Sequence, residues 1–408
     1  MKNVNIHSLK KNLIKIMFLS VLFESICLKK IESFSITLTF FLTTILLFIC
    51  IIEKIQEKLE LKKTLFVLFS IIYFLLISFF SKYTFNESSL FLYTYYLIFF
   101  LFVSNTLENE EMNSLIKTFI KLVCLFSIYA IYQFCVYNLW NFLPLKELIP
   151  SNILTPNYNT FSNILVGNKY FFRAHSIYLE PSFLSQFSAI AILLTYYCEI
   201  KNKKLIYIIN IISMIMSLSG TGFIILIFGL FYILIMQKNY KLFIIINLLI
   251  IMCFAFIYIN KDTNMDFAKY YINRMNELDF ENKGSSGYYR FILPIKATGD
   301  VLRNDIFGVG AGNDIILANK YGSNESGIPN GYGKMFVEFG IFGIVFFIVI
   351  FKMLAPNKND SNINKILFII IIAYCFTGGS FVQNSFWCLA ILNLRDGRRI
   401  NESFNYMQ

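Results

Sequence analysis

Long runs of apolar residues, separated by shorter polar segments, dominate the chain. Because a helix needs about 20 mostly apolar residues to cross a bilayer, each run is a candidate membrane span. The candidate spans are residues 13–28, 34–52, 64–80, 88–104, 117–137, 181–198, 205–217, 222–236, 242–259, 333–351, 364–377 and 380–394. The pattern predicts an all-α polytopic membrane protein of about 12 transmembrane helices, with residues 1–408 forming a single integral membrane domain.

The first run, residues 13–28, differs from the others because it contains Lys15 and Glu24. A basic segment precedes it, as in a signal peptide, but no small-residue cleavage site follows, so we interpret it as a span. We expect charges within the spans to be limited to these two residues. A proton or ion relay through the bilayer is therefore not favoured.

Two of the segments between the runs, 138–180 and 260–332, are long and polar. The first is rich in asparagine and aromatic residues, a composition that suits binding to sugar rings and equally suits an ordinary surface loop. In the second, the pattern predicts an amphipathic helix over 266–278 and a helix over 287–303 that is kinked at its proline. The glycines of 307–313 permit tight turns but do not form a dinucleotide-binding fingerprint.

Two short connections, 217–222 and 377–380, are rich in glycine and serine and contain no basic residue. They fit hairpin turns between helices. They fit equally well the breaks of discontinuous helices that line a cavity, and the sequence leaves both open.

Composition supports the membrane class, since 57% of residues are hydrophobic, only 15% are charged and the mean hydropathy is +0.61. A net charge of +11 would suggest a nucleic-acid partner in a soluble protein. Here the basic residues lie in short connections such as 54–63, 201–204 and 395–399. We expect them to set orientation and contact membrane lipids rather than nucleic acid. The positive-inside rule then predicts cytoplasmic N- and C-termini, with 138–180 and 260–332 outside.

The eight cysteines all lie within or beside apolar runs, which favours packing over disulfides or a zinc site. His175 is one of only two histidines. No metal site, metal-dependent hydrolysis or Ser/His/Asp triad is therefore expected, and His175 alone is typical of a hydrogen-bonding loop residue.

The most polar cluster beside an apolar run is RAHSIYLEPS, Arg173 to Ser182. Pro181 suits the first turn of the following helix, where Glu180 would meet the positive end of the helix dipole, so this pair has a structural explanation. Arg173 could bind a phosphate, pair with Glu180 or extend toward the interface. In the second long segment, Arg290, Lys296 and Arg303 could likewise neutralise an anionic lipid substrate or attract headgroups.

These stretches resemble the O-antigen polymerase and ligase superfamily of membrane glycosyltransferases, whose polymerases are called Wzy-type. RAHSIYLEPSF is similar to the family's Arg-x-x-Ser-x-x-x-Glu-Pro element, and SLSGTGF to its serine-rich turn. The stretches Tyr288–Asn313 and Asn330–Gly343 resemble its arginine-containing loop with a Gly-x-Gly turn and its Glu-x-Gly-x-x-Gly helix start.

The resemblance implies a metal-independent and cofactor-independent polymerase in the bacterial inner membrane. It would extend O-antigen, other lipopolysaccharide, capsule or exopolysaccharide chains from undecaprenyl-diphosphate-linked units, with a chain-length regulator as a further candidate partner. Arg173 and Arg290 would hold the diphosphate, and Glu180 would orient or deprotonate the acceptor hydroxyl. Further substrate-binding candidates are Arg303, His175, Lys296 and Asn330.

The sequence differs from the ligases of the superfamily at one position, which bears on the choice between polymerase and ligase. Ligases of the superfamily carry a histidine before the helix that follows the large loop, whereas this chain reads Ile328-Pro329-Asn330-Gly331. A ligase is therefore the less favoured alternative, and the acid/base residue stays unassigned. A flippase for lipid-linked oligosaccharide is a further alternative, but the two long polar segments are unlike the short loops expected of a transporter.

Overall fold

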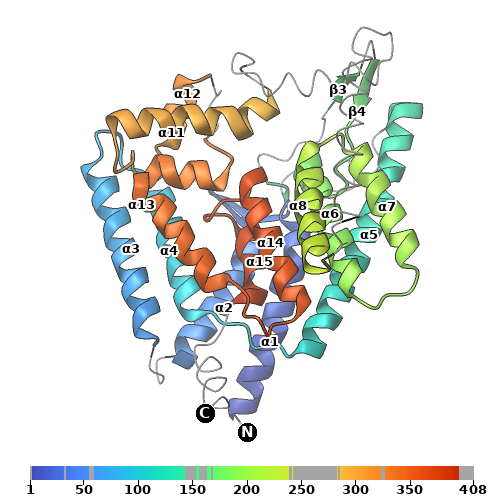
Figure 1. Ribbon diagram of the computed structural model, residues 1–408, viewed down its shortest axis with the longest axis horizontal. Helices are drawn as coiled ribbons and strands as arrows, with labels where there is room; N and C mark the ends of the chain where they lie inside the picture. The colour runs from blue at the N-terminus through green and yellow to red at the C-terminus, as the bar shows by residue number, and fades with distance from the viewer. Residues whose placement is uncertain are drawn as a thin grey trace. The chain divides into compact units, whose positions relative to one another are not determined.

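A computed structural model describes residues 2–31, 34–54, 59–142, 153–155, 163–166, 169–238, 241, 283, 285–322 and 327–394. The chain divides into two compact units, which are described separately: unit 1 is Met1–Leu115 with Leu293–Gln408, and unit 2 is Ile116–Ile292. Most described residues are helical, which confirms the all-α class (Figure 1). Two small antiparallel hairpins, which the sequence did not predict, add to the helices.

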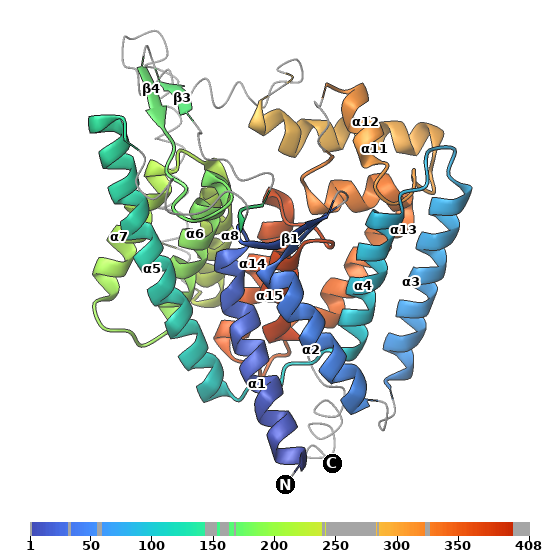
Figure 2. The ribbon, with the colours of Figure 1, turned by 180° about the vertical axis from the view of Figure 1, so that it is seen from behind.

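The N-terminal half of unit 1 consists of α1 (Lys2–Ser20), η1 (Val21–Phe23), β1 (Cys27–Ile31), β2 (Phe34–Thr37), α2 (Leu38–Lys54), α3 (Leu61–Phe80), α4 (Glu87–Phe102) and the start of α5 (Asn109–Trp140). Helix α1 packs against α2, and α3 against α4 (Figure 2). The predicted span 13–28 is wrong as a single helix, because α1 ends at Ser20 and the chain then turns into the β1–β2 hairpin. The Lys15 ammonium lies 2.9 Å from the Glu111 carboxylate, so this charge is paired.

The C-terminal half of unit 1 consists of α11 (Leu293–Asn304), α12 (Asp314–Lys320), α13 (Gly331–Leu354), α14 (Asn362–Thr377), α15 (Asn384–Ala390) and η4 (Ile391–Asn393). The predicted span 380–394 is thus a short α-helix followed by a 3-10 turn. Its residues are nevertheless central to the core: Trp387 is fully buried, stacks on Tyr96 of α4 and donates a hydrogen bond to the Phe381 carbonyl. Apolar packing within the unit accounts for the hydrophobicity of this run.

Helix α13 is broken at Gly340, whose φ of 60° and ψ of −145° are non-helical, and Figure 1 shows the helix changing direction. A Cβ at this position would lie 2.0 Å from the Ile306 carbonyl oxygen, so only glycine fits. The break frees carbonyl groups of the first half-helix. Val309 N–H donates to the backbone carbonyl oxygen of Val337 at 3.0 Å, and Gly310 N–H donates to the backbone carbonyl oxygen of Glu338 at 2.9 Å. The 307–313 loop thus supplies the hydrogen bonds that the helix loses.

The 307–313 loop contains three glycines with positive φ: Gly308 at 100°, Gly310 at 90° and Gly312 at 75°. This confirms the prediction of tight turns. Ala311 N–H donates to Ser78 Oγ at 3.0 Å, which ties the loop to α3 as well as to α13.

Unit 2 contains the rest of α5, β3 (Asn163–Val166), β4 (Lys169–Phe172), α6 (Pro181–Tyr197), α7 (Lys203–Met216), α8 (Gly220–Met236) and the π-helical turn η3 (Tyr288–Ile292). Helix α6 packs against both α7 and α8. Buried polar groups join the helices: Ser127 Oγ donates to Asn210 Oδ1 at 2.9 Å, and the Ser188 and Ser213 hydroxyls lie 2.9 Å apart. Such hydrogen bonds are common between helices in apolar surroundings.

Three described helices are long and apolar enough to cross a membrane, namely α3, α5 and α13. Helices α4, α8 and α14 are apolar but shorter. The number of spans therefore stays a prediction. The predicted span 242–259 and the predicted amphipathic helix 266–278 lie outside the described residues.

Candidate functional site

Arg173 lies in unit 2, between β4 and α6, and is half-buried. Its Nε donates to the carbonyl oxygen of Ser217 at 3.1 Å, at the C-terminus of α7. The neighbouring Ala174 N–H donates to the Met216 oxygen at 3.1 Å. The guanidinium is therefore held at the α7–α8 turn, where the carbonyl end of a helix favours a cation.

Glu180 is the N-cap of α6, and Pro181 occupies the first turn. Glu180 Oε2 accepts a hydrogen bond from Ser182 Oγ at 3.0 Å. The predicted structural role of the Glu-Pro pair is confirmed. Among the described contacts, Arg173 Nε donates to a backbone carbonyl and Glu180 accepts from Ser182.

His175 is buried, with 1% of its surface exposed. Gln133 of α5 fixes this part of the loop, because its Oε1 accepts from the backbone N–H groups of His175 and Ser176. The imidazole also contacts the Phe172 ring edge to face, with centroids 5.9 Å apart. These contacts place His175 in the interior of unit 2.

The remaining basic candidates fall into both units. Arg290 lies in η3 of unit 2 and is half-buried, so it shares a unit with Arg173. Lys296 and Arg303 lie in α11 of unit 1, where their spacing puts both on one helical face as predicted. The proline of this stretch, Pro294, lies in the first turn of α11, directly after the π-helical turn. The helix predicted over 287–303 is therefore a π-helical turn followed by an α-helix, and the change from one to the other lies beside the proline where a kink was predicted.

Asn330 is the N-cap of α13. Its Oδ1 accepts from Gly333 N–H at 3.0 Å, and its Nδ2 donates to the Phe376 carbonyl oxygen at 3.0 Å. Both ends of the amide therefore fix the start of α13 against α14, and the residue is largely buried.

Replacing Asn330 by alanine is expected to lower the free energy of unfolding by about 1 kcal/mol, the usual contribution of an N-cap. Asn330→Ser should lose less, because the serine hydroxyl can still accept from the Gly333 N–H and introduces no charge beside the Phe376 carbonyl. Chemical unfolding of the purified protein in detergent measures both. Equal losses in the two variants would contradict the capping role.

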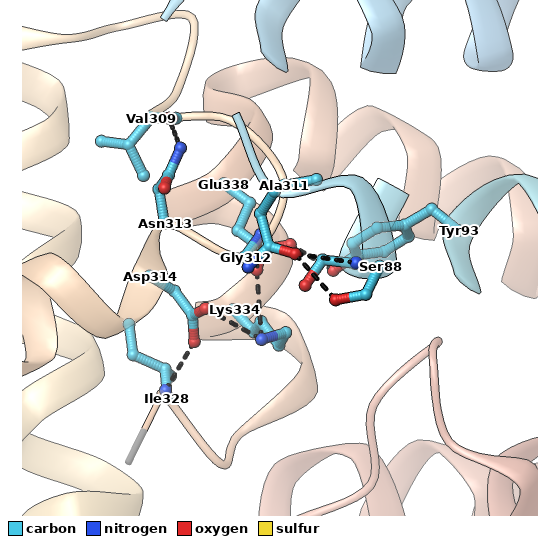
Figure 3. A network of polar contacts seen from close by, with 12 residues as sticks. Ser88, Tyr93, Val309, Ala311, Gly312, Asn313, Asp314, Ile328, Lys334 and Glu338 are labelled. Carbon is cyan, nitrogen blue, oxygen red and sulfur yellow. Dashed lines mark hydrogen bonds and ion pairs between the residues drawn. The ribbon is translucent and has the colours of Figure 1, made fainter. Parts of the chain in front are cut away.

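The structure also brings together three charged residues that the sequence analysis did not select (Figure 3). The Lys334 ammonium lies 2.9 Å from Asp314 Oδ1 and 3.1 Å from Glu338 Oε1. Both carboxylate side chains are fully buried, and the lysine side chain is 17% exposed. We call these three residues the α12–α13 ion cluster.

Neutral donors complete the ion cluster. Tyr93 of α4 donates its hydroxyl to Glu338 Oε2, and Gly312 N–H donates to Glu338 Oε1 at 2.9 Å. Ile328 N–H donates to Asp314 Oδ2 at 2.7 Å. Burial opposes ionisation of Asp314, but the Lys334 ammonium and the hydrogen bonds from Glu338 and the Ile328 N–H outweigh it, so the pKa of Asp314 lies below its ordinary value. Asp314 and Glu338 share one ammonium and accept further hydrogen bonds, so the side chains of the cluster are held in place.

The expectation that charges within long apolar runs are limited to Lys15 and Glu24 is wrong. Lys334 and Glu338 lie in the first half of α13, one turn apart. The signal was present in the sequence as a lysine and a glutamate at i and i+4 in a helical run. The rest of that run is strongly apolar, so the run was interpreted as a span without charges.

Among the residues that the structure describes, no group of three His, Cys, Asp or Glu side chains could hold a metal ion. The seven cysteines within the described ranges are free thiols, and Cys135 is exposed. Two polar features therefore stand out among the described residues: the Arg173 guanidinium at the α7–α8 turn of unit 2 and the buried α12–α13 ion cluster of unit 1.

No curated protein matches the chain, and no solved structure matches it. The family described as WcaD colanic acid polymerase matches residues 13–394, a range that contains the predicted arginines and the ion cluster. The chain therefore belongs to the WcaD colanic acid polymerase family of membrane polysaccharide polymerases, consistent with the Wzy-type resemblance.

Proposed function

We propose that the protein polymerises oligosaccharide repeat units carried on undecaprenyl diphosphate, at the outer face of the bacterial cytoplasmic membrane. The family match carries the proposal, because it spans nearly all the apolar runs and both arginine-containing segments. The topology proposed with it has about 12 spans, cytoplasmic termini, and segments 138–180 and 260–332 outside.

In the proposed reaction, a hydroxyl oxygen of the acceptor unit attacks the anomeric carbon of the growing chain. The bond from that carbon to the carrier diphosphate breaks, the diphosphate leaves with the electron pair, and the hydroxyl proton passes to a base. Negative charge develops on the leaving diphosphate, where guanidinium groups stabilise it most effectively. We assign this role to Arg173 and Arg290, with Arg303 as a weaker third contact.

The location of Arg173 supports this assignment. A backbone carbonyl of the α7–α8 turn fixes its Nε, so the side chain is oriented before substrate arrives. Glu180, at the start of α6, is the proposed group that orients or deprotonates the acceptor. Of the other candidates, His175 is buried, Lys296 is half-buried and Asn330 caps α13, so we assign them supporting rather than chemical roles.

Arg290→Ala tests the diphosphate assignment. In a strain lacking the native gene, we expect the variant to give shorter polymer and lower yield, because one cation at the leaving group is lost. Arg290→Lys should retain part of the activity, since it keeps the charge without the planar fork. Unchanged polymer length and yield in Arg290→Ala would remove Arg290 from the site.

The reaction class itself is tested with purified protein and a lipid-linked repeat unit. A ladder of lengthened lipid-linked products is expected. Transfer onto a lipid A core would instead identify a ligase. Movement of the substrate across a vesicle membrane without chemical change would identify a flippase.

A further inference from the structure

An open pocket of about 530 Å³ lies in unit 1 where the chain turns from α3 into α4. Its volume is within the range of small-molecule sites. Its described lining combines polar Thr84, Asn86, Glu87 and Ser88 with apolar Phe85, Phe91 and Leu92. None of these residues belongs to the arginine segments of the proposed function.

The chemistry of the lining selects a class of ligand. Phe85 and Phe91 are 46% and 55% exposed, so their rings can cover the C–H face of a sugar. Hydroxyl, amide and carboxylate groups beside them are partners for sugar hydroxyls. Glu87 is exposed and, within the described part of the chain, forms no salt bridge, so its carboxylate can accept hydrogen bonds from a ligand.

The same lining argues against two other ligands. Among the described lining residues there is no lysine or arginine, and the Glu87 carboxylate would repel a diphosphate. Acyl chains are disfavoured because a carboxylate and three neutral polar side chains would lose hydration against lipid. A neutral saccharide satisfies both the aromatic and the polar groups.

The 307–313 loop, which donates a hydrogen bond to Glu338 of the α12–α13 ion cluster, packs against the wall of the pocket. Asn86 Oδ1 accepts from Ser89 N–H and Ser88 Oγ, each at 3.0 Å, so the cap of α4 is already occupied. A Cβ on Gly312 would lie 2.7 Å from Asn86 Nδ2, which shows how closely the 307–313 loop abuts this wall. The same Gly312 donates its N–H to Glu338. Gly312 therefore links the ion cluster to the start of α4, which forms this wall.

We propose that this pocket is a saccharide subsite that holds a neutral sugar of the glycan substrate. Glu87 accepts hydrogen bonds from its hydroxyls, and Phe91 stacks on its ring. The inference rests on the proposed function only for the biological source of the sugar. Binding itself is a property of the pocket.

The test uses full-length protein in nanodiscs and saturation-transfer NMR, with the methyl glycosides of glucose, galactose, fucose and N-acetylglucosamine as probes. Native protein is expected to transfer saturation to at least one glycoside. Glu87→Gln and Phe91→Leu should each bind that glycoside about tenfold more weakly, the effect of losing hydrogen bonds to a charged group or an aromatic stack. Glu110→Gln is the matched control, since Glu110 is an exposed glutamate in the first turn of another helix.

Native protein that transfers saturation to none of the glycosides would overturn the inference, as would equal binding by native protein and both pocket variants. Unfolding midpoints close to native verify that the variants are folded. Polymerisation of the lipid-linked repeat unit, measured on the same samples, separates the two proposals. Glycoside binding that depends on Glu87 without any polymerisation would support the pocket and contradict the proposed function. Polymerisation by native protein that binds no glycoside would support the proposed function and contradict the saccharide pocket.

Discussion

Replacing Lys334 by methionine is expected to lower the free energy of unfolding by about 3 to 5 kcal/mol, the range seen when one partner of a buried ion pair is removed. Methionine fills a similar volume, so lost packing contributes little. The variant leaves the fully buried carboxylates of Asp314 and Glu338 without their cation. Chemical unfolding of the protein in detergent measures the loss.

The same variant should reverse the response to pH. In the native protein the pKa of Asp314 is lowered, so its contribution is complete above the unfolded value of about 4 and is lost only as pH falls through the lower folded value. Without the ammonium, burial is the largest influence left on Asp314 and would raise its pKa above the unfolded value, although the hydrogen bonds from Glu338 and Ile328 still lower it. As pH falls from neutral to about 5, the free energy of unfolding of the variant should therefore rise, because its folded state binds a proton that its unfolded state does not. Over the same range, Asp314 does not change the stability of the native protein.

Lys352→Met is the matched control for Lys334→Met, because Lys352 lies in the last turn of the same helix and is exposed. A surface substitution of this kind should change the free energy of unfolding by no more than about 0.5 kcal/mol. Equal unfolding midpoints for the two variants, or a loss in Lys334→Met that grows on acidification, would show that the ion cluster does not stabilise the fold.

The sequence predicted features that local patterns determine. The apolar runs 64–80 and 222–236 correspond closely to α3 and α8, because a turn of polar or small residues bounds each run. The Glu180-Pro181 helix start was likewise predictable, since the capping residue and the proline act within one turn. In each case the residues that determine the structure are adjacent in the chain.

Features that depend on distant segments were not predictable in this way. The break at Gly340 is stable because the 307–313 loop, remote in sequence, supplies hydrogen bonds to α13. The run 380–394 is apolar for packing around Trp387, and hydropathy does not distinguish a buried short helix from a span. The contact from Arg173 to Ser217 likewise joins two segments whose proximity is decided by the packing of α6 against α7.

Arg173→Ala is expected to reduce the rate of polymerisation about 100- to 1,000-fold, the usual effect of removing one group that stabilises developing charge. Arg173→Lys should fall between this variant and the native protein, since lysine keeps a positive charge but lacks the guanidinium fork. Incorporation of repeat units by purified protein, at varied substrate concentration, measures kcat and KM. Lys201→Ala, at an exposed position elsewhere in unit 2, is the matched control and should retain native activity.

Arg173→Gln separates the two roles that Arg173 has in the proposal. Glutamine can still donate to the Ser217 carbonyl, as Arg173 Nε does at 3.1 Å, but it carries no charge. If Arg173 stabilises the leaving diphosphate, Arg173→Gln should be as inactive as Arg173→Ala while unfolding close to the native midpoint. If its role is only to hold the α7–α8 turn, Arg173→Gln should retain activity and Arg173→Lys should not. That second result would leave the leaving-group contact to Arg290, with Arg303 as the weaker contact.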